Sequence, residues 1–219
     1  MPKLRVHNMT MSLDGYVAGP HQSAARPLGE GGERLHPWVF ATRTGAAMLG
    51  DPDTGSTGID DDFIAAGEKN IGATIIGRNM FGPVRGPWPD ESWRGWWGEN
   101  PPYHHDVFVL THHARPSLPM DGGTTFHFVD DDPAAVLARA FDAAQGQDVR
   151  LGGGASTVQS FLQAGLIDQL HLAIAPVLLG QGERLFANLG GDAADYSLDY
   201  VVTDVVTTPA VTHVTLRRS

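Results

Sequence analysis

Residues 148–157, DVRLGGGAST, pass from a short apolar strand pattern through three consecutive glycines into the start of a helix pattern. Val149 and Leu151 alternate with polar residues as in a strand, and after Gly154 apolar residues recur at helical spacing as far as Leu166. A helix that begins directly after glycines exposes its first N–H groups, and glycine lets a phosphate group approach the backbone closely. The stretch therefore predicts a strand, a turn and a helix that can bind a phosphate, although three glycines at such a turn can also serve the turn alone.

The glycine stretch matches neither of two common nucleotide-binding motifs. It is not the G-x-G-x-x-G motif, and no acidic residue follows about 20 positions later at the end of a second strand. A P-loop would require a lysine followed by serine or threonine after the glycines, and Ala155-Ser156 stand there instead. A Rossmann dinucleotide fold and a P-loop are therefore excluded.

The same order of strand, turn and helix recurs along the chain. Strands are predicted at residues 4–11, 73–76, 107–110, 124–129, 148–151 and 171–179. Helices are predicted at 60–69, after 130–132 and after Gly154. Residues 33–41 could form a short helix, which Pro37 either limits to Pro37 onward or breaks. In the tail, at about 196–217, apolar and polar residues alternate, which predicts an antiparallel hairpin with its turn at 207–209. Strands that alternate with helices favour a mainly parallel central sheet flanked by helices, and we expect one α/β domain over residues 1–219.

Composition limits the classes of function. The 219 residues include 15 basic and 25 acidic side chains, a net charge of −10, whereas nucleic-acid binding requires a basic face. No apolar run reaches the roughly 20 residues of a membrane span. Cysteine is absent, which excludes disulfides, thiolate metal sites and a cysteine nucleophile. We expect a soluble, cytoplasmic protein with a small-molecule substrate and neither a nucleic-acid nor a membrane partner.

Polar residues follow two further predicted strands. Gly77-Arg78-Asn79 ends the strand at 73–76, and Thr111-His112-His113-Ala114-Arg115 ends the strand at 107–110. Ligands of open α/β sheets bind beyond the carboxyl ends of the strands, and an arginine there can hold a phosphate with two hydrogen bonds. Each group could equally be ordinary surface polarity. In each of the pairs His104-His105 and His112-His113, the two adjacent side chains would point to opposite faces of a strand. Each pair therefore offers at most one ligand to a common ion, and we expect no metal site.

Five motifs resemble, in the right order, those of one known family. They are SLDGYVAG at 12–19, IGRNMF at 76–81, VLT at 109–111, LGGG at 151–154 and APVLLGQGERLF at 175–186. Together they resemble the dihydrofolate-reductase-like superfamily, in the branch of the reductase domain of the bifunctional riboflavin-biosynthesis deaminase–reductase. The resemblance spans about residues 4–217. It implies a three-layer α/β/α fold with a mixed sheet of about eight strands, NADPH as cofactor, and a homodimer formed through the C-terminal strands.

The resemblance also implies where NADPH binds. The diphosphate would lie against Gly152, Gly153, Gly154, Ala155 and Ser156. Gly77 and Arg78 would lie at the adenosine side, with Arg78 at the 2′-phosphate, assisted by Thr111 and His112. The backbone of residues 9–12 and the strand end at 175–176 would flank the nicotinamide.

Hydride transfer requires an oriented substrate, the exclusion of water and a proton source. Asp14 is the predicted catalytic residue, which either holds a substrate hydroxyl or supplies a proton, and it could instead cap the turn before Gly15. Ser12, His36 and Trp38 are placed in the substrate pocket, although Trp38 could be a core residue and His36 a surface one. The tryptophan cluster at 88–97 could be a partner surface, but we expect the stretch 82–102 to be a packed lid beside the cofactor cleft.

Two departures from the family narrow the expected activity. Dihydrofolate reductases carry a carboxylate on the first helix to bind the pterin, and the nearest acid here, Glu33, does not match that position. The absence of cysteine rules out a zinc deaminase domain in this chain. We therefore expect a standalone NADPH-dependent reductase of a heterocyclic or ribosylamino substrate, such as 5-amino-6-(5-phosphoribosylamino)uracil. Dihydrofolate reduction and a non-catalytic NADPH-binding module are the alternatives.

Overall fold

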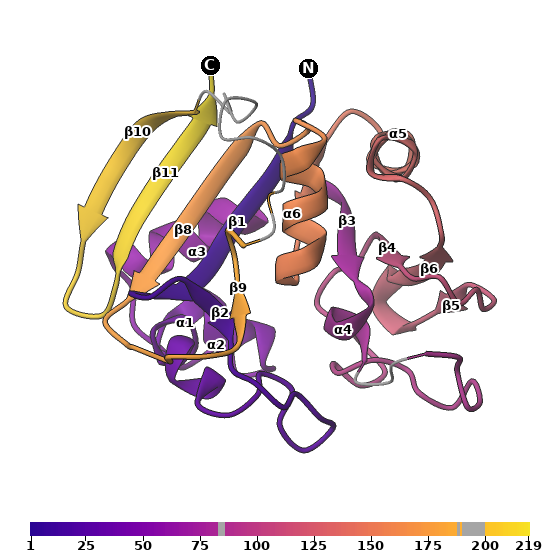
Figure 1. The fold of residues 1–219 in the computed structure, drawn as a ribbon, viewed down its shortest axis with the longest axis horizontal. Coiled ribbons are helices and arrows are strands. Elements are labelled where there is room, and N and C mark those ends of the chain that lie inside the picture. The colour runs from indigo at the N-terminus through magenta and orange to yellow at the C-terminus, as the bar shows by residue number, and fades with distance from the viewer. Residues whose placement is uncertain (83–85, 188, 190–199) are drawn as a thin grey trace. The chain divides into compact units, whose positions relative to one another are not determined.

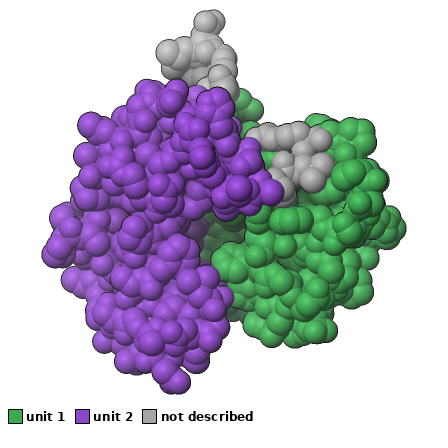
Figure 2. All heavy atoms as spheres, turned by 90° about the horizontal axis from the view of Figure 1, so that it is seen from below, with its two compact units in different colours: residues 1–6, 70–168 green, residues 7–69, 169–219 purple. Residues whose placement is uncertain are grey.

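The computed structural model describes residues 1–82, 86–187, 189 and 200–219 (Figure 1). These residues form two compact units, which Figure 2 distinguishes by colour. Unit 1 contains residues 1–6 and 70–168, and unit 2 contains residues 7–69 and 169–219. That residues 1–219 form one domain stays a prediction. Within the described residues, no helix has the length and apolar character needed to cross a membrane.

Unit 1 is built on a mainly parallel sheet. Its parallel strands, in order, are the start of β1 (Leu4–Ser12), β7 (Asp148–Leu151), β3 (Ile71–Gly77), β4 (Asp106–Leu110) and β6 (Thr125–Val129). The short strand β5 (Leu118–Pro119) adds an antiparallel edge to β6. Because parallel neighbours need crossover connections, the predicted alternation of strands and helices is what this sheet requires. The strands expected at 73–76, 107–110, 124–129 and 148–151 are confirmed.

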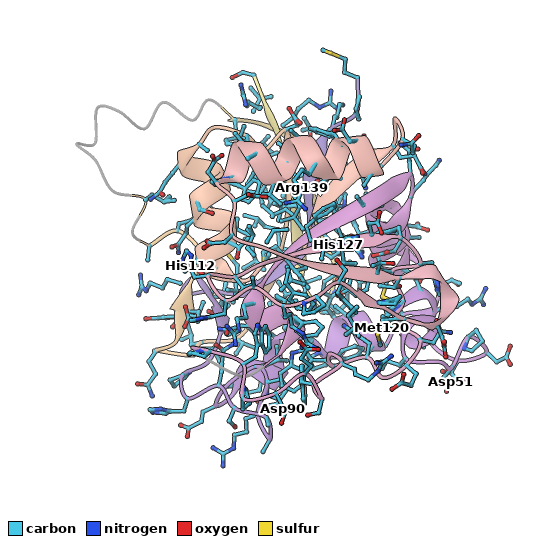
Figure 3. All side chains as sticks on the ribbon, turned by 90° about the vertical axis from the view of Figure 1, so that its right-hand side faces the viewer. Asp51, Asp90, His112, Met120, His127 and Arg139 are labelled. Atoms are coloured by element: carbon cyan, nitrogen blue, oxygen red, sulfur yellow. The ribbon has the colours of Figure 1, made fainter. Side chains whose placement is uncertain are left out.

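The two faces of this sheet are covered differently. The helix α5 (Pro133–Ala143) covers one face, and Figure 3 shows Arg139 of this helix above the strand that carries His127. The opposite face holds a buried cluster that includes Ile76, Phe81 and Phe126, and Trp88 and Trp93 pack against it. The tryptophan-rich stretch is therefore packed, as predicted, apart from residues 83–85, which lie outside the described residues. Its role as a lid stays a prediction.

Two helices begin where strands of unit 1 end. The helix α4 (Arg78–Phe81) directly follows β3, and α6 (Ala155–Gln163) follows β7 after the three glycines. The buried residues of α6 include Val158, Phe161 and Leu162, on the face that the helical spacing predicted. A short 3-10 turn at Asp121–Gly123 precedes β6.

Unit 2 contains a sheet in which β10 (Tyr200–Thr207) pairs with β11 (Thr212–Arg218), and β11 with β8 (Gln169–Ala175), in antiparallel fashion. The rest of β1 follows β8 in the order of this sheet. A 3-10 turn (Gly32–Leu35) and the helices α1 (Pro37–Phe40), α2 (Arg43–Met48) and α3 (Ile59–Glu68) complete the unit, with a small sheet of β2 (Tyr16–Ala18) and β9 (Glu183–Arg184). A buried cluster contains Leu35, Trp38 and Ile64 from the helical segments and Ala173 and Ala175 from β8.

Most predicted elements of unit 2 are confirmed, with two differences. The closing hairpin is present, although residues 196–199 of the predicted tail lie outside the described residues. The strand expected at 171–179 ends at Ala175, because Pro176 has no N–H group to continue a ladder. The helix α2 was not predicted; it begins at the Thr42 cap, whose side chain accepts the Gly45 N–H, and it packs on α1 and α3.

Candidate functional site

The glycine turn of unit 1 lies beside the end of β3. The Gly77 N–H donates to the Gly153 carbonyl at 2.6 Å, and the Gly152 N–H donates to the Ile75 carbonyl at 2.9 Å. These two bonds place the glycines and Arg78 at the carboxyl ends of two adjacent parallel strands. They also occupy the amides of Gly77 and Gly152, so donors for a bound phosphate have to come from residues 153–156.

Gly77, Gly152 and Gly154 differ in which atoms a larger side chain would contact. A Cβ at Gly77 would lie 2.3 Å from Thr157 Oγ1, and one at Gly152 would lie 3.0 Å from Ile76 Cγ2. At Gly154 a Cβ would meet nothing within 4 Å, and the backbone φ of −74° suits any residue. Packing therefore explains Gly77 and Gly152, whereas Gly154 leaves open space at the start of α6. Among the described residues no side chain caps this helix end, so its first N–H groups remain available to an anion.

Arg78 carries the clearest sign of a missing partner. Its Nη1 donates to Thr111 Oγ1 at 3.3 Å, and its guanidinium carbon lies 3.6 Å from the centre of the Trp88 ring. Its Nε and Nη2 are buried and have no hydrogen-bond partner among the described residues. These two nitrogens share one edge of the planar guanidinium, which is the edge that pairs with two oxygens of a phosphate or carboxylate. Burial, followed by the charge of Arg115, lowers the pKa of Arg78.

The turn after β4 holds the two other residues that the resemblance assigned to the cofactor. Thr111 is buried, and its Oγ1 also accepts the His113 N–H at 3.1 Å, so the hydroxyl is held toward Arg78. His112 is exposed (Figure 3). Its Nδ1 lies 2.6 Å from Asp130 Oδ1. The structure thus brings Thr111 to Arg78 and pairs His112 with Asp130. Contact of His112 with a cofactor stays a prediction.

Asp14, in unit 2, joins two segments of the chain. Its Oδ1 accepts the Ser12 hydroxyl at 2.6 Å and the Leu179 N–H at 3.2 Å, and its Oδ2 accepts the Gly180 N–H at 2.7 Å. The Ser12 bond, with help from the two backbone donors, lowers the pKa of Asp14 to about 2. An aspartate that is ionised at neutral pH is a poor proton donor. Of its two predicted roles, only acceptance of a substrate hydroxyl agrees with this environment.

The residues placed in the substrate pocket have different surroundings. Ser12 is fully buried, and its hydroxyl accepts the Tyr16 N–H at 2.9 Å while it donates to Asp14. Trp38 is 5% exposed, and its Nε1 donates to Thr10 Oγ1 at 3.1 Å, so it is the core residue that the sequence left as an alternative. The pKa of His36 is lowered by burial, and its Nδ1 is buried with no hydrogen-bond partner among the described residues.

The segments expected to flank the nicotinamide both lie in unit 2. The strand β1 ends at Ser12 and β8 ends at Ala175, and just beyond them the Leu13 N–H donates to the Val177 carbonyl at 2.9 Å. The two segments therefore lie together, as the resemblance implied. Their contact with a cofactor stays a prediction.

Unit 2 also contains a buried chain of histidines that the sequence reasoning missed. The Asn8 N–H lies 3.1 Å from His171 Nδ1, His171 Nε2 lies 3.1 Å from His213 Nδ1, and His213 Nε2 lies 2.9 Å from Asp60 Oδ1. A backbone N–H can only donate, so His171 Nδ1 accepts, the proton sits on Nε2, and His213 takes the same tautomer. Burial, with smaller effects of His7 and His213, lowers the pKa of His171 to about 3. No local sequence signal connects these residues, because their pairing depends on the register of the sheet.

Comparison with known proteins identifies the family. Residues 2–208 match the family model of the RibD C-terminal domain, and the chain therefore belongs to that family. An uncharacterized Bacillus subtilis protein, YyaP, is 46% identical over 44 residues, a match that covers 20% of this chain and 23% of that protein. The resemblance inferred from the five ordered motifs is confirmed.

Solved structures share the fold. A protein from Shewanella sp. PV-4, provisionally named as a riboflavin biosynthesis protein, gives a TM-score of 0.60 at 21% identity, with 100% of this chain and 99% of that chain covered. A deaminase/5-amino-6-(5-phosphoribosylamino)uracil reductase from Thermotoga maritima gives 0.58 at 14% identity; the match covers 100% of this chain and 57% of that one. Dihydrofolate reductase from Enterococcus faecalis, complexed with NADP(H), gives 0.50 at 14% identity, with coverage of 99% and 96%. The dihydrofolate-reductase-like fold, with a mixed sheet and a C-terminal antiparallel pair, is confirmed.

Proposed function

We propose that this chain is an NADPH-dependent reductase of a small heterocyclic or ribosylamino substrate, of the 5-amino-6-(5-phosphoribosylamino)uracil reductase type. The observation that carries the proposal is the Nε/Nη2 edge of Arg78 beside the glycine turn, for which the described residues supply no hydrogen-bond acceptor. A partly buried cation with no acceptor on that edge is costly unless a ligand supplies one. Family membership and the reductase names of structural relatives support the same class of reaction.

The residues of unit 1 fit the phosphate groups of NADPH. Residues 153–156, with the open space at Gly154, would hold the diphosphate at the start of α6. Arg78 and Thr111 would hold the 2′-phosphate, and His112 is the nearby candidate for the adenine side. Bound NADPH would supply a hydride to the substrate. The preference for a phosphorylated cofactor follows from Arg78, because a guanidinium edge without a partner gains most from a doubly charged phosphate.

The substrate would be held by residues of unit 2. Asp14 keeps acceptor capacity while it remains ionised, and it would therefore orient a substrate hydroxyl. The proton for the product would then come from another group or from water. His36, with its buried unpaired Nδ1, is the candidate in this unit to bind the polar part of a heterocycle.

Cofactor titration tests the proposal. The wild type should quench its tryptophan fluorescence on NADPH addition and bind NADPH more tightly than NADH. Arg78→Ala should weaken NADPH binding by about 10- to 100-fold, since hydrogen bonds to charged groups contribute about 1.5–3 kcal/mol, and it should change NADH binding little. Arg139→Ala, which removes an arginine of the α5 face, serves as the matched control. Equal affinity of the wild type for the two cofactors would contradict the proposal.

One observation favours the binding module as a second candidate. Ser12, Asp14 and Trp38 all make internal hydrogen bonds, which leaves few groups free for catalysis in this part of unit 2. The test is whether a pyrimidine, pteridine or quinone oxidises bound NADPH. Steady oxidation by any of them supports the reductase, and binding without oxidation supports the module. For dihydrofolate we expect little turnover.

We also propose that β10 pairs with a second copy of the chain. Among the described strands it is last in the order of its sheet, and Val201, Val202 and Val205 are 51%, 58% and 58% exposed. An exposed apolar edge strand is a ready partner for another strand. We expect a homodimer at micromolar concentration by light scattering, and a monomer for Val205→Lys. A monomeric wild type would contradict the proposal.

A further inference from the structure

We infer that Trp88 is a positioning residue for the phosphate subsite, which holds the guanidinium of Arg78 in place without neutralising its charge. The inference rests on the proposed function and extends it, because it assigns a role to the tryptophan-rich segment. It starts from one contact: the Arg78 guanidinium carbon lies 3.6 Å from the centre of the Trp88 ring.

The Trp88 ring is itself held firmly. Its Nε1 donates to the His113 carbonyl at 2.8 Å, which ties the indole to the turn after β4. Its edges make T-shaped contacts with Phe81 at 5.9 Å and Phe128 at 5.7 Å between ring centres. Both phenylalanines belong to the buried cluster of unit 1. The orientation of the indole is therefore set by the core and by one backbone acceptor.

Arg115 stabilises the segment that carries this ring. Its Nη1 donates to the Trp93 carbonyl at 3.0 Å and its Nη2 donates to the Glu91 carbonyl at 2.9 Å. Its guanidinium carbon also lies 5.1 Å from the centre of the Trp88 ring and 4.8 Å from that of Phe128. Arg115 thus connects the tryptophan-rich segment to the aromatic cluster and keeps a second positive charge close to Arg78.

Two contacts define how the Arg78 guanidinium lies. The face of Trp88 contacts the guanidinium carbon at 3.6 Å, and the bond from Nη1 to Thr111 Oγ1 fixes one end of the group. A carboxylate in the same role would occupy the Nε/Nη2 edge and cancel the charge. An aromatic face attracts the cation through its ring quadrupole and leaves that edge for a ligand. This arrangement keeps both the orientation and the net positive charge that a phosphate monoester requires.

The opposite interpretation is that Trp88 covers the subsite and has to leave before a ligand binds. The contacts of the indole with Phe81, Phe128 and the His113 carbonyl argue against it, because a removable cover would not share the buried cluster. The two interpretations predict opposite effects of removing the ring.

The test uses two nucleotides that differ by one phosphate. Adenosine 2′,5′-bisphosphate and adenosine 5′-monophosphate are titrated calorimetrically into the wild type, Trp88→Leu and Trp97→Leu. Trp97, 37% exposed in the same segment, provides the matched control. Trp88→Leu should lower the affinity for the bisphosphate about tenfold, which lies within the range of cation–π contributions. It should change the affinity for the monophosphate by no more than about twofold. Trp97→Leu should bind both nucleotides like the wild type.

A second measurement avoids any loss of folding. Fluorinated tryptophans of increasing substitution weaken the ring quadrupole with little change of shape, and they are incorporated into the wild type and Trp88→Phe. The bisphosphate affinity should fall stepwise with fluorination in the wild type and stay level in Trp88→Phe. Equal affinity across the wild-type series, or tighter binding by Trp88→Leu, overturns the inference while the proposed function stands. A wild type that binds neither the bisphosphate nor NADPH overturns both.

Discussion

The buried histidines give this protein a defined response to acid. His171 lies between His213 on β11 and the Asn8 N–H on β1, with His7 beside it and Phe63 of α3 stacked on both His171 and His213. Its only proton, on Nε2, is already donated, and its Nδ1 faces a backbone donor. A second proton on His171 would therefore place two N–H groups against each other at a side chain that is fully buried. Folding keeps this ring neutral.

The size of the effect follows from the pKa. The folded pKa of His171 is about 3, below its ordinary 6.5, so between these values the unfolded chain binds the extra proton and the folded chain does not. Stability is then complete above pH 6.5 and falls as the pH drops toward 3. From pH 7 to pH 5 the free energy of unfolding should fall by about 2 kcal/mol for His171. At pH 5 this figure hardly depends on the folded value, because any pKa below about 4 leaves the folded ring neutral.

Urea unfolding at pH 7 and pH 5 measures this loss. The comparison is between the wild type, His171→Asn and the exposed control His21→Asn, whose φ of 57° asparagine adopts readily. His171→Asn is expected to lower the free energy of unfolding at pH 7. It should also reduce the difference in this free energy between pH 7 and pH 5 by about 2 kcal/mol. A separate check is the ¹⁵N spectrum, which should show the Nε2–H tautomer for both His171 and His213. If the His171 ring titrates near pH 6.5, or if His171→Asn retains the full pH dependence, the reasoning is wrong.

Four further predictions concern single positions. The pKa of His105 is lowered to about 4, mainly by burial, so this residue should add about 2 kcal/mol to the fall in the free energy of unfolding between pH 7 and pH 5. His105→Gln should remove this contribution in the same urea experiment. Gly77→Ala should destabilise by about 1–3 kcal/mol through its 2.3 Å approach to Thr157 Oγ1, and adding Thr157→Ala should restore most of this; without such rescue the clash is not the cause. Gly154→Ala should change the free energy of unfolding by no more than about 0.5 kcal/mol, yet lower the affinity for NADPH more than tenfold. Unchanged NADPH binding would show that the diphosphate lies elsewhere. Asp14→Asn should leave the shape of the pH–rate profile between pH 4 and 8 unchanged, because a group with a pKa of about 2 does not titrate there; loss of a limb would restore Asp14 as proton donor.

Much of unit 1 could be predicted from local patterns. The strands β3, β4, β6 and β7 are short apolar runs that end in glycine or polar residues, and α5 and α6 carry apolar residues at helical spacing. Such patterns are set by backbone sterics and by which face is hidden from water, and neighbouring residues suffice to express them. In unit 2, by contrast, the small strands β2 and β9 were not predicted, because they contain three and two residues, too few to show a period.

The candidate site was predictable in part. Arg78 and the glycine turn follow strands whose carboxyl ends meet at one edge of a parallel sheet, so their proximity could be inferred. That Gly154 faces open space while Gly77 packs on Thr157 could not, because both are glycines at strand ends. The contact of Trp88 with Arg78 was not predicted for a similar reason, because it depends on how a long loop folds back onto the sheet.

The amino-acid order alone determined the family, the sequence of strands and helices, and the glycine turn between a strand and a helix, because each depends on residues close together in the chain. Only the tertiary structure decided which polar groups are already satisfied. Ser12, Asp14 and Trp38 form hydrogen bonds within the protein, whereas the Nε/Nη2 edge of Arg78 has no acceptor in the part of the chain that the structure describes. The same applies to His171 and His213, 42 residues apart, which meet because antiparallel register brings their strands together. Hydrogen-bond pairing of this kind is a property of distances in space, and no period along the chain encodes it.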